Sequence, residues 1–122
     1  MLAIAQGRAQ TTTPPPQDTD SIYTKVEIRP EFPGGPASLA RFVNKNIRFP
    51  VDAKGHPILG TVVVQFIVDQ NGRHTDEQAI SGPEELRQEA VRVIKLSSLW
   101  TPPWTNGHSV KAYKQVPIEF KK

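Results

Sequence analysis

Residues 60–72 read GTVVVQFIVDQNG, and this stretch decides the fold. Its apolar side chains alternate with a period of two, so the even-numbered residues share one face of an extended chain. β-Branched residues dominate it, which favours a strand. Asn71-Gly72 is typical of a tight hairpin turn. We therefore expect a strand over 60–68 that returns antiparallel over 73–80.

Two amphipathic helices are expected, one on each side of this hairpin in the sequence. After the turn residues 31–35, apolar residues recur at helical spacing with a proline in the first turn, and they predict a helix over 36–46. Ser81-Gly82-Pro83 followed by two glutamates indicates a second helix start. That helix should cover 83–97.

The C-terminal residues 110–120 alternate again and predict a third strand. Pro117 has no N–H to donate to a neighbouring strand, so this strand fits a sheet edge better than a sheet centre. The expected fold class is α+β, with two helices packed on one face of a small three-stranded antiparallel sheet and the C-terminal strand at an edge.

The N-terminal residues 1–25 have a different composition. They hold three consecutive prolines at positions 14–16 and few large apolar side chains, so we expect a disordered tether ahead of a folded domain over 26–122. Ala3-Ile4-Ala5 resembles the end of a secretory signal whose charged and apolar parts are missing. That reading would make the protein an exported one.

Composition excludes several classes of function. The 122 residues contain no cysteine, which rules out disulfides and thiol chemistry, and no apolar run approaches the roughly 20 residues of a membrane helix. The net charge of +3 is scattered along the chain, so we expect no nucleic-acid partner. The histidines His56, His74 and His108 lack metal-ligand spacing, and Asp76-Glu77 fits a solvated strand better than a catalytic pair. We expect no metal, no cofactor and no enzymatic activity.

Several short motifs occur together in a recognisable order. They are Phe32-Pro33-Gly34-Gly35, Ile47-Arg48-Phe49-Pro50, the strand and turn of residues 60–72, Trp100-x-Pro102, and Val116-Pro117-Ile118-x-Phe120. Together they make the chain resemble the C-terminal domain of TonB, in the form common among Bacteroidetes-type bacteria, from about Val26 to Lys122.

This resemblance implies a periplasmic coupling domain. Such a domain binds the TonB box of outer-membrane receptors by adding it as a strand to a sheet edge, which supports energised nutrient uptake, and an inner-membrane proton-driven complex acts on it when it is part of a longer transducer. The residues expected to bind the partner are Arg48 and Phe49 together with Val110, Lys111, Ala112, Tyr113, Lys114, Gln115, Val116 and Glu119. Of these, Lys111, Tyr113, Gln115 and Glu119 should face away from the helices.

The chain also departs from the family pattern. His74 and Glu77 stand where the family usually has apolar residues, so we expect that strand to be shorter, irregular or mobile. A full TonB has an N-terminal membrane helix and a long proline-rich spacer, so the sequence fits either a fragment of a transducer or a stand-alone exported domain. The alternative function is an unanchored exported module that occupies receptors or binds cell-wall polymer. An exposed edge strand also favours an edge-paired or domain-swapped homodimer.

Overall fold

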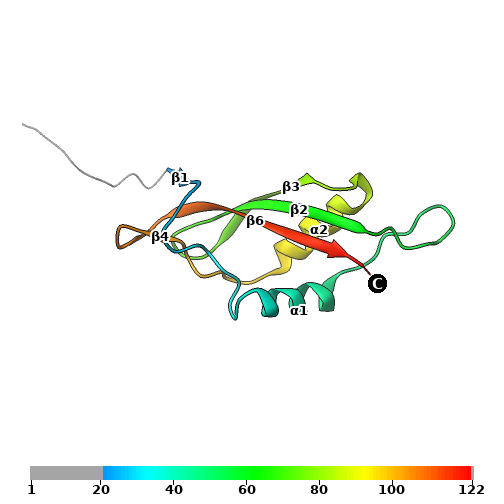
Figure 1. Ribbon diagram of the computed structural model, residues 1–122, viewed down its shortest axis with the longest axis horizontal. Coiled ribbons are helices and arrows are strands. Elements are labelled where there is room, and N and C mark those ends of the chain that lie inside the picture. The colour runs from blue at the N-terminus through cyan, green and yellow to red at the C-terminus, as the bar shows by residue number, and fades with distance from the viewer. Residues whose placement is uncertain (1–20, 122) are drawn as a thin grey trace, which may run out of the picture.

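The computed structural model describes residues 21–121, which form two helices and six strands (Figure 1). The helices are α1 (Pro36–Asn46) and α2 (Glu84–Leu96). The strands are β1 (Ile22–Tyr23), β2 (Gly60–Val68), β3 (His74–Ser81), β4 (Trp104–Thr105), β5 (His108–Ser109) and β6 (Lys111–Phe120). None of the helices in the described part is long and apolar enough to cross a membrane.

The main sheet has the strand order β1-β6-β2-β3. β2 and β3 form the hairpin expected at Asn71-Gly72, and β6 pairs antiparallel with β2 without a break in register, from Gly60 opposite Phe120 to Val68 opposite Ala112. β1 pairs in parallel with the first two residues of β6. Figure 1 shows the three long strands side by side, with α2 behind them.

The α+β class is confirmed, but the prediction of three antiparallel strands was wrong. The sheet has a fourth, parallel strand, and β4 and β5 form a separate two-stranded ribbon. The sequence pattern could not predict β1, β4 or β5, because a strand of two residues is too short to show alternating apolar and polar side chains. β1 lies within the expected tether of residues 1–25, while residues 1–20, with the suspected signal remnant, lie outside the described residues.

The core lies on one face of the sheet, where the even-numbered side chains of β2 and β6 meet both helices. α2 contributes Leu86, Ala90, Val93 and Ile94, while α1 contributes Val43. The even positions of β2 from Val62 to Val68 are fully buried. Each fully buried side chain of this size is worth roughly 1.5–3 kcal/mol of transfer free energy, so the period-two and helical patterns specify the same core.

The expected irregularity of β3 is confirmed by two breaks in its register with β2. Between Gln65 and Ile67 the partner residue moves from Gln78 to Thr75, so β3 has an extra residue there, and Asp76 adopts a left-handed φ of 57°. A second extra residue follows between Ala79 and Ser81. Both breaks are β-bulges on β3, which leave β2 itself regular.

Candidate functional site

A sheet edge with unpaired backbone groups can bind an extended peptide, and this sheet has two such edges. One belongs to β3, where the two bulges interrupt the row of backbone groups that a guest strand would need. The other belongs to β6, which keeps a regular register with β2 along its whole length. The β6 edge is therefore the better template.

β1 covers only the beginning of this edge. It pairs with Lys111 and Ala112, and no other described strand lies on that side of β6. Val110 lies before the strand, and its N–H donates to the carbonyl oxygen of Pro103 at 2.9 Å. The free edge, as we use the term below, therefore consists of residues 113–120, and the first three of the eight expected strand residues lie outside it.

The direction of the backbone groups along this edge follows from the hairpin. The N–H of Asp69 donates to the carbonyl oxygen of Arg73 at 2.9 Å, so the odd-numbered residues of β2 turn their N–H groups toward β3 and the even-numbered ones toward β6. Val64 and Val116 are therefore a hydrogen-bonded pair, and Val63 and Pro117 are a non-hydrogen-bonded pair.

Pro117 thus turns its nitrogen toward the free edge. No hydrogen bond between β2 and β6 is lost through its missing N–H, which explains how the strand accepts a proline without a register break. On the outer side, Tyr113, Gln115 and Glu119 offer both N–H and C=O, whereas Pro117 offers only its C=O. A guest strand on this edge would therefore lack one hydrogen bond, the one that an N–H at position 117 would have donated.

The side chains along the free edge alternate as the sequence predicted. Tyr113, Gln115 and Glu119 are exposed on the face away from the helices, and Lys111 is half-buried there. Gln115 also donates from Nε2 to Oε1 of Gln65 on β2, at 3.0 Å. Val116 is 3% exposed and belongs to the core, so its side chain is closed to a partner.

Arg48 and Phe49, predicted as secondary contacts, lie near the other end of the strand. The ring of Phe49 packs edge-to-face against Phe120, the last residue of β6, with 6.0 Å between centroids. The backbone N–H of Arg48 donates to Oε2 of Glu89 on α2, at 2.7 Å. The structure therefore brings this segment to the C-terminal end of the free edge.

Glu89 and Arg92 on α2 hold that segment in place. Arg92 donates to both carboxylate oxygens of Glu89, at 2.8 and 2.6 Å, and also to the carbonyl oxygen of Asn46, at 2.8 Å. Burial by itself would raise the pKa of the Glu89 carboxyl, but hydrogen bonds from Arg92 and Arg48 and their positive charges outweigh it, so this pKa lies below its usual 4.5. No local sequence pattern predicts these contacts, because they join residues 41 or more positions apart.

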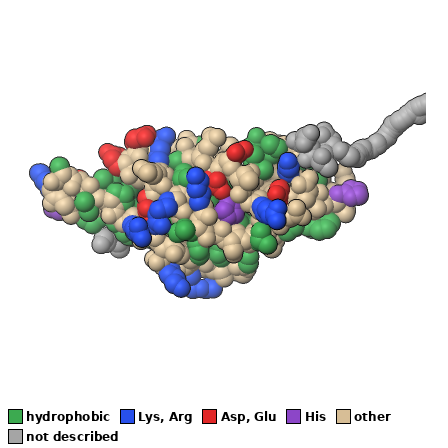
Figure 2. Space-filling model, turned by 180° about the vertical axis from the view of Figure 1, so that it is seen from behind, with side chains coloured by type: hydrophobic (Ala, Val, Ile, Leu, Met, Phe, Trp, Pro, Cys, Tyr) green, Lys and Arg blue, Asp and Glu red, His purple; other side chains and the backbone are tan. Residues whose placement is uncertain are grey.

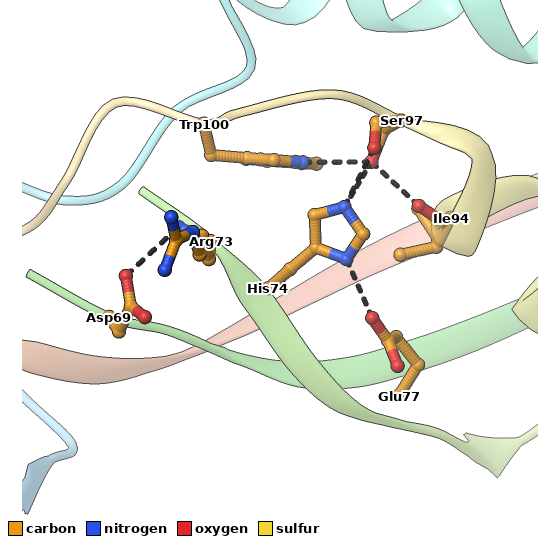
Figure 3. Close-up of polar contacts among 7 residues, drawn as sticks. All are labelled: Asp69, Arg73, His74, Glu77, Ile94, Ser97 and Trp100. Carbon is orange, nitrogen blue, oxygen red and sulfur yellow. Dashed lines mark hydrogen bonds and ion pairs between the residues drawn. The ribbon is translucent and has the colours of Figure 1, made fainter. Parts of the chain in front are cut away.

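A second polar cluster lies between β3 and the C-terminal end of α2 (Figure 3). His74 contacts the carboxylate of Glu77 through Nδ1 and the carbonyl oxygen of Ser97 through Nε2, at 2.6 and 2.8 Å. The Ser97 hydroxyl donates to the carbonyl oxygen of Ile94 and accepts from Nε1 of Trp100. Glu77 is therefore not the solvated residue that the sequence suggested.

This cluster contains the residue types of a hydrolase triad without its geometry. The Ser97 hydroxyl oxygen lies 3.2 Å from Nε2 of His74. A nucleophilic serine must give its proton to the histidine, but the Ser97 hydroxyl donates to the carbonyl oxygen of Ile94 at 2.6 Å and is buried. No group of three metal-ligating side chains exists within residues 21–121. The face shown in Figure 2 mixes Lys and Arg with acidic and apolar side chains, without a continuous basic stripe.

A comparison with known families finds a match over the greater part of the chain. Residues 45–121 match the family model described as the Gram-negative bacterial TonB protein C-terminal, which covers well over half of the chain. The chain belongs to this family. No protein with a curated description matches the sequence.

The family assignment confirms the resemblance derived from the motifs. TonB C-terminal domains act in the periplasm of Gram-negative bacteria as protein-interaction and transducer domains, and they interact with outer-membrane receptors. The matched residues include α2 and the whole of β2, β3 and β6, and thus the free edge.

Proposed function

We propose that this chain is a periplasmic coupling domain that binds the TonB box of outer-membrane receptors by strand addition at residues 113–120 and thereby supports energised nutrient uptake. The observation that carries this proposal is the difference between the two sheet edges. β6 is regular and open beyond its second residue, whereas β3 is bulged twice. Its main-chain groups can pair with an extended segment of varied sequence.

The expected affinity suits a transient coupler. About five new main-chain hydrogen bonds, each contributing a net ~0.5–1.5 kcal/mol, are opposed by ~2–5 kcal/mol for ordering the guest segment. At its most favourable this balance is about 5.5 kcal/mol, which corresponds to a dissociation constant of about 0.1 mM, and the rest of the range gives weaker binding. A receptor held this weakly can be released after each cycle.

The test is an NMR titration of the labelled protein with a peptide from the N-terminus of an outer-membrane receptor that contains its TonB box. We expect saturable amide shifts at residues 113–120 and around Phe49. Amides of β3 should move little, because its edge is interrupted. Shifts confined to β3 or to the helices would contradict the proposal.

Two variants at one position sharpen this test. Gln115→Pro removes an outward N–H without touching the hydrogen bonds between β6 and β2, so the fold should survive while peptide binding weakens. Gln115→Ala keeps the N–H and removes only the side-chain bond to Gln65. We expect Gln115→Ala to bind the peptide like the wild type. Equal binding by all three proteins would show that the β6 edge is not the site.

A negative titration would favour the alternative function. If millimolar receptor peptide shifts no amide of the folded protein, the unanchored module that binds cell-wall polymer becomes the leading hypothesis. Sedimentation with insoluble peptidoglycan would then test it directly.

A further inference from the structure

A hollow of about 430 Å³ lies at the beginning of the free edge, between the segment 24–30 that follows β1 and residues 112–115 of β6. Its wall on the β6 side includes Tyr113 and Gln115, whose outward backbone groups would pair with a guest strand. A guest bound along the free edge must end beside this hollow, because β1 already occupies Lys111 and Ala112.

Every charged side chain that lines the hollow is positive. Lys25 and Arg29 come from the segment after β1, and Lys114 comes from β6. Within residues 21–121, Lys25 and Arg29 have no carboxylate partner, and Lys114 has a long contact of 3.9 Å between Nζ and Oε1 of Glu31. The Lys114 side chain is 20% exposed, so its charge is less screened by water than that of a fully exposed lysine.

The opposite end of the free edge has a different chemistry. Phe49 packs on Phe120 there, and the cations near that end lie beside carboxylates. Lys121 contacts Glu119 at 3.1 Å, and Arg92 and Arg48 act on Glu89. The two ends of the binding edge therefore differ in charge, which would distinguish one end of a guest strand from the other.

We infer that the hollow binds a carboxylate side chain at the end of the receptor segment that lies beside Tyr113, through Lys25, Arg29 and Lys114. This inference rests on the proposed strand addition and adds a requirement on the guest, namely an Asp or Glu at one end. Glu31 competes with that carboxylate for Lys114. The hollow thus sets the orientation and register of the guest, while the backbone supplies most of the affinity.

The experiment uses four synthetic peptides of alternating Thr and Val, acetylated and amidated so that no terminal charge remains. Two have a single Glu at the first or the last position, and two have Gln at the same positions. We expect one Glu peptide to bind about 3- to 10-fold more tightly than its Gln counterpart, as one partly enclosed ion contact would give. The other Glu peptide should show no preference, and higher salt should remove the difference.

Variants of the chain test the residues. The double variant Lys25→Gln, Arg29→Gln should abolish the preference for Glu, while Glu31→Gln should increase it, because Lys114 then loses its competing partner. The matched control is Lys45→Gln, Lys95→Gln, which removes the same charge from the last turns of α1 and α2. The control should keep the preference.

The outcomes separate this inference from the proposed function. If all four peptides shift the amides of residues 113–120 with equal affinity, strand addition stands and the carboxylate site is wrong. If the control variant loses the preference as fully as the hollow variant does, the effect is one of net charge and the site is also wrong. If no peptide shifts those amides, the proposed function and this inference fail together.

Discussion

Nδ1 of His74 lies 2.6 Å from Oε2 of Glu77, and both side chains are almost buried, with 12% and 9% of their surface exposed. The other ring nitrogen faces the carbonyl oxygen of Ser97, whose own hydroxyl already donates to Ile94. Both ring nitrogens therefore have a polar partner, the Glu77 carboxylate on one side and the Ser97 carbonyl oxygen on the other. These contacts join β3 to the end of α2, and we call the His74–Glu77 pair the latch.

Removing one member of this latch should destabilise the protein. We expect Glu77→Ala to lower the free energy of unfolding by about 2–4 kcal/mol, because it leaves a buried donor without its acceptor. Glu77→Gln should cost less, since an amide oxygen can still accept the hydrogen bond. Urea denaturation of both variants, of His74→Gln and of the double variant would give the coupling energy of the pair. Strictly additive losses would show that the two side chains act independently.

The turn between β2 and β3 contains a second constraint. Gly72 has φ of 83°, and a Cβ at this position would lie 2.0 Å from the carbonyl oxygen of Trp100, whose N–H also donates to the Gly72 carbonyl oxygen. Gly72→Ala should therefore cost about 3 kcal/mol or more, from backbone strain and from displacement of Trp100.

Gly107 provides the matched control for this substitution. Its φ of 78° is similar, but a Cβ there would meet nothing within 4 Å. Gly107→Ala should cost only the strain, about 1 kcal/mol. Thermal unfolding of the two variants separates the cost of backbone strain from the cost of the contact with Trp100. Equal losses of stability would contradict a close contact between Gly72 and Trp100.

The sequence predicted the helices and strands in which apolar residues recur at a regular spacing. α1 begins and ends at the expected residues, 36 and 46, and β2 does so at 60 and 68, because local periodicity and turn residues agree there. Pro117 also led us to expect an edge strand over residues 110–120, because proline disfavours the centre of a sheet. This prediction was right only in part, since β1 pairs with Lys111 and Ala112 and leaves residues 113–120 open. These features depend on neighbours in the sequence.

The parts that were missed depend on contacts between distant segments. Nothing local marks Ile22 as the partner of Lys111, or places Lys25 and Arg29 beside Lys114. Likewise, Glu77 is polar and was expected in water, but its side chain is only 9% exposed and contacts His74, which in turn contacts Ser97 at the end of α2. Tertiary pairing overrides local polarity in such cases.

Glu89 should make stability dependent on pH in the acid range. Its pKa is lower in the folded protein than its ordinary 4.5, because the contacts with Arg92 and Arg48 outweigh burial. The stabilisation is therefore complete above the unfolded-state pKa and is lost as the pH falls through the folded-state value. We expect Glu89→Gln to cost about 1 kcal/mol at pH 7 and progressively less below pH ~4.5.

Urea denaturation at several pH values from 7 to 3 would measure this difference. Glu84→Gln is a suitable control, because Glu84 lies on the same helix and is exposed, with only a long contact to Arg87 of 3.9 Å. Its effect should stay small throughout. A Glu89→Gln penalty that persists unchanged at pH 3 would show that the carboxylate charge does not matter.

Pro117 is expected to limit pairing at the free edge. Pro117→Ala adds an outward N–H while leaving the β2–β6 hydrogen bonds intact, so a receptor peptide should bind about 2- to 10-fold more tightly, the value of one net hydrogen bond. The same gain applies to a second copy of the chain, so sedimentation should show more edge-paired dimer than in the wild type. NMR titration and sedimentation velocity on one sample would measure both.

The stability of Pro117→Ala tests the assignment of the backbone direction itself. If the nitrogen of residue 117 faces outward, the variant loses only the entropic benefit of proline in the unfolded chain, about 0.4–1 kcal/mol. If instead it faced Val63, the new N–H would complete an internal hydrogen bond. The variant would then be at least as stable as the wild type and would bind no more peptide. A stability gain together with unchanged affinity would thus contradict the direction inferred from the Asp69–Arg73 hydrogen bond.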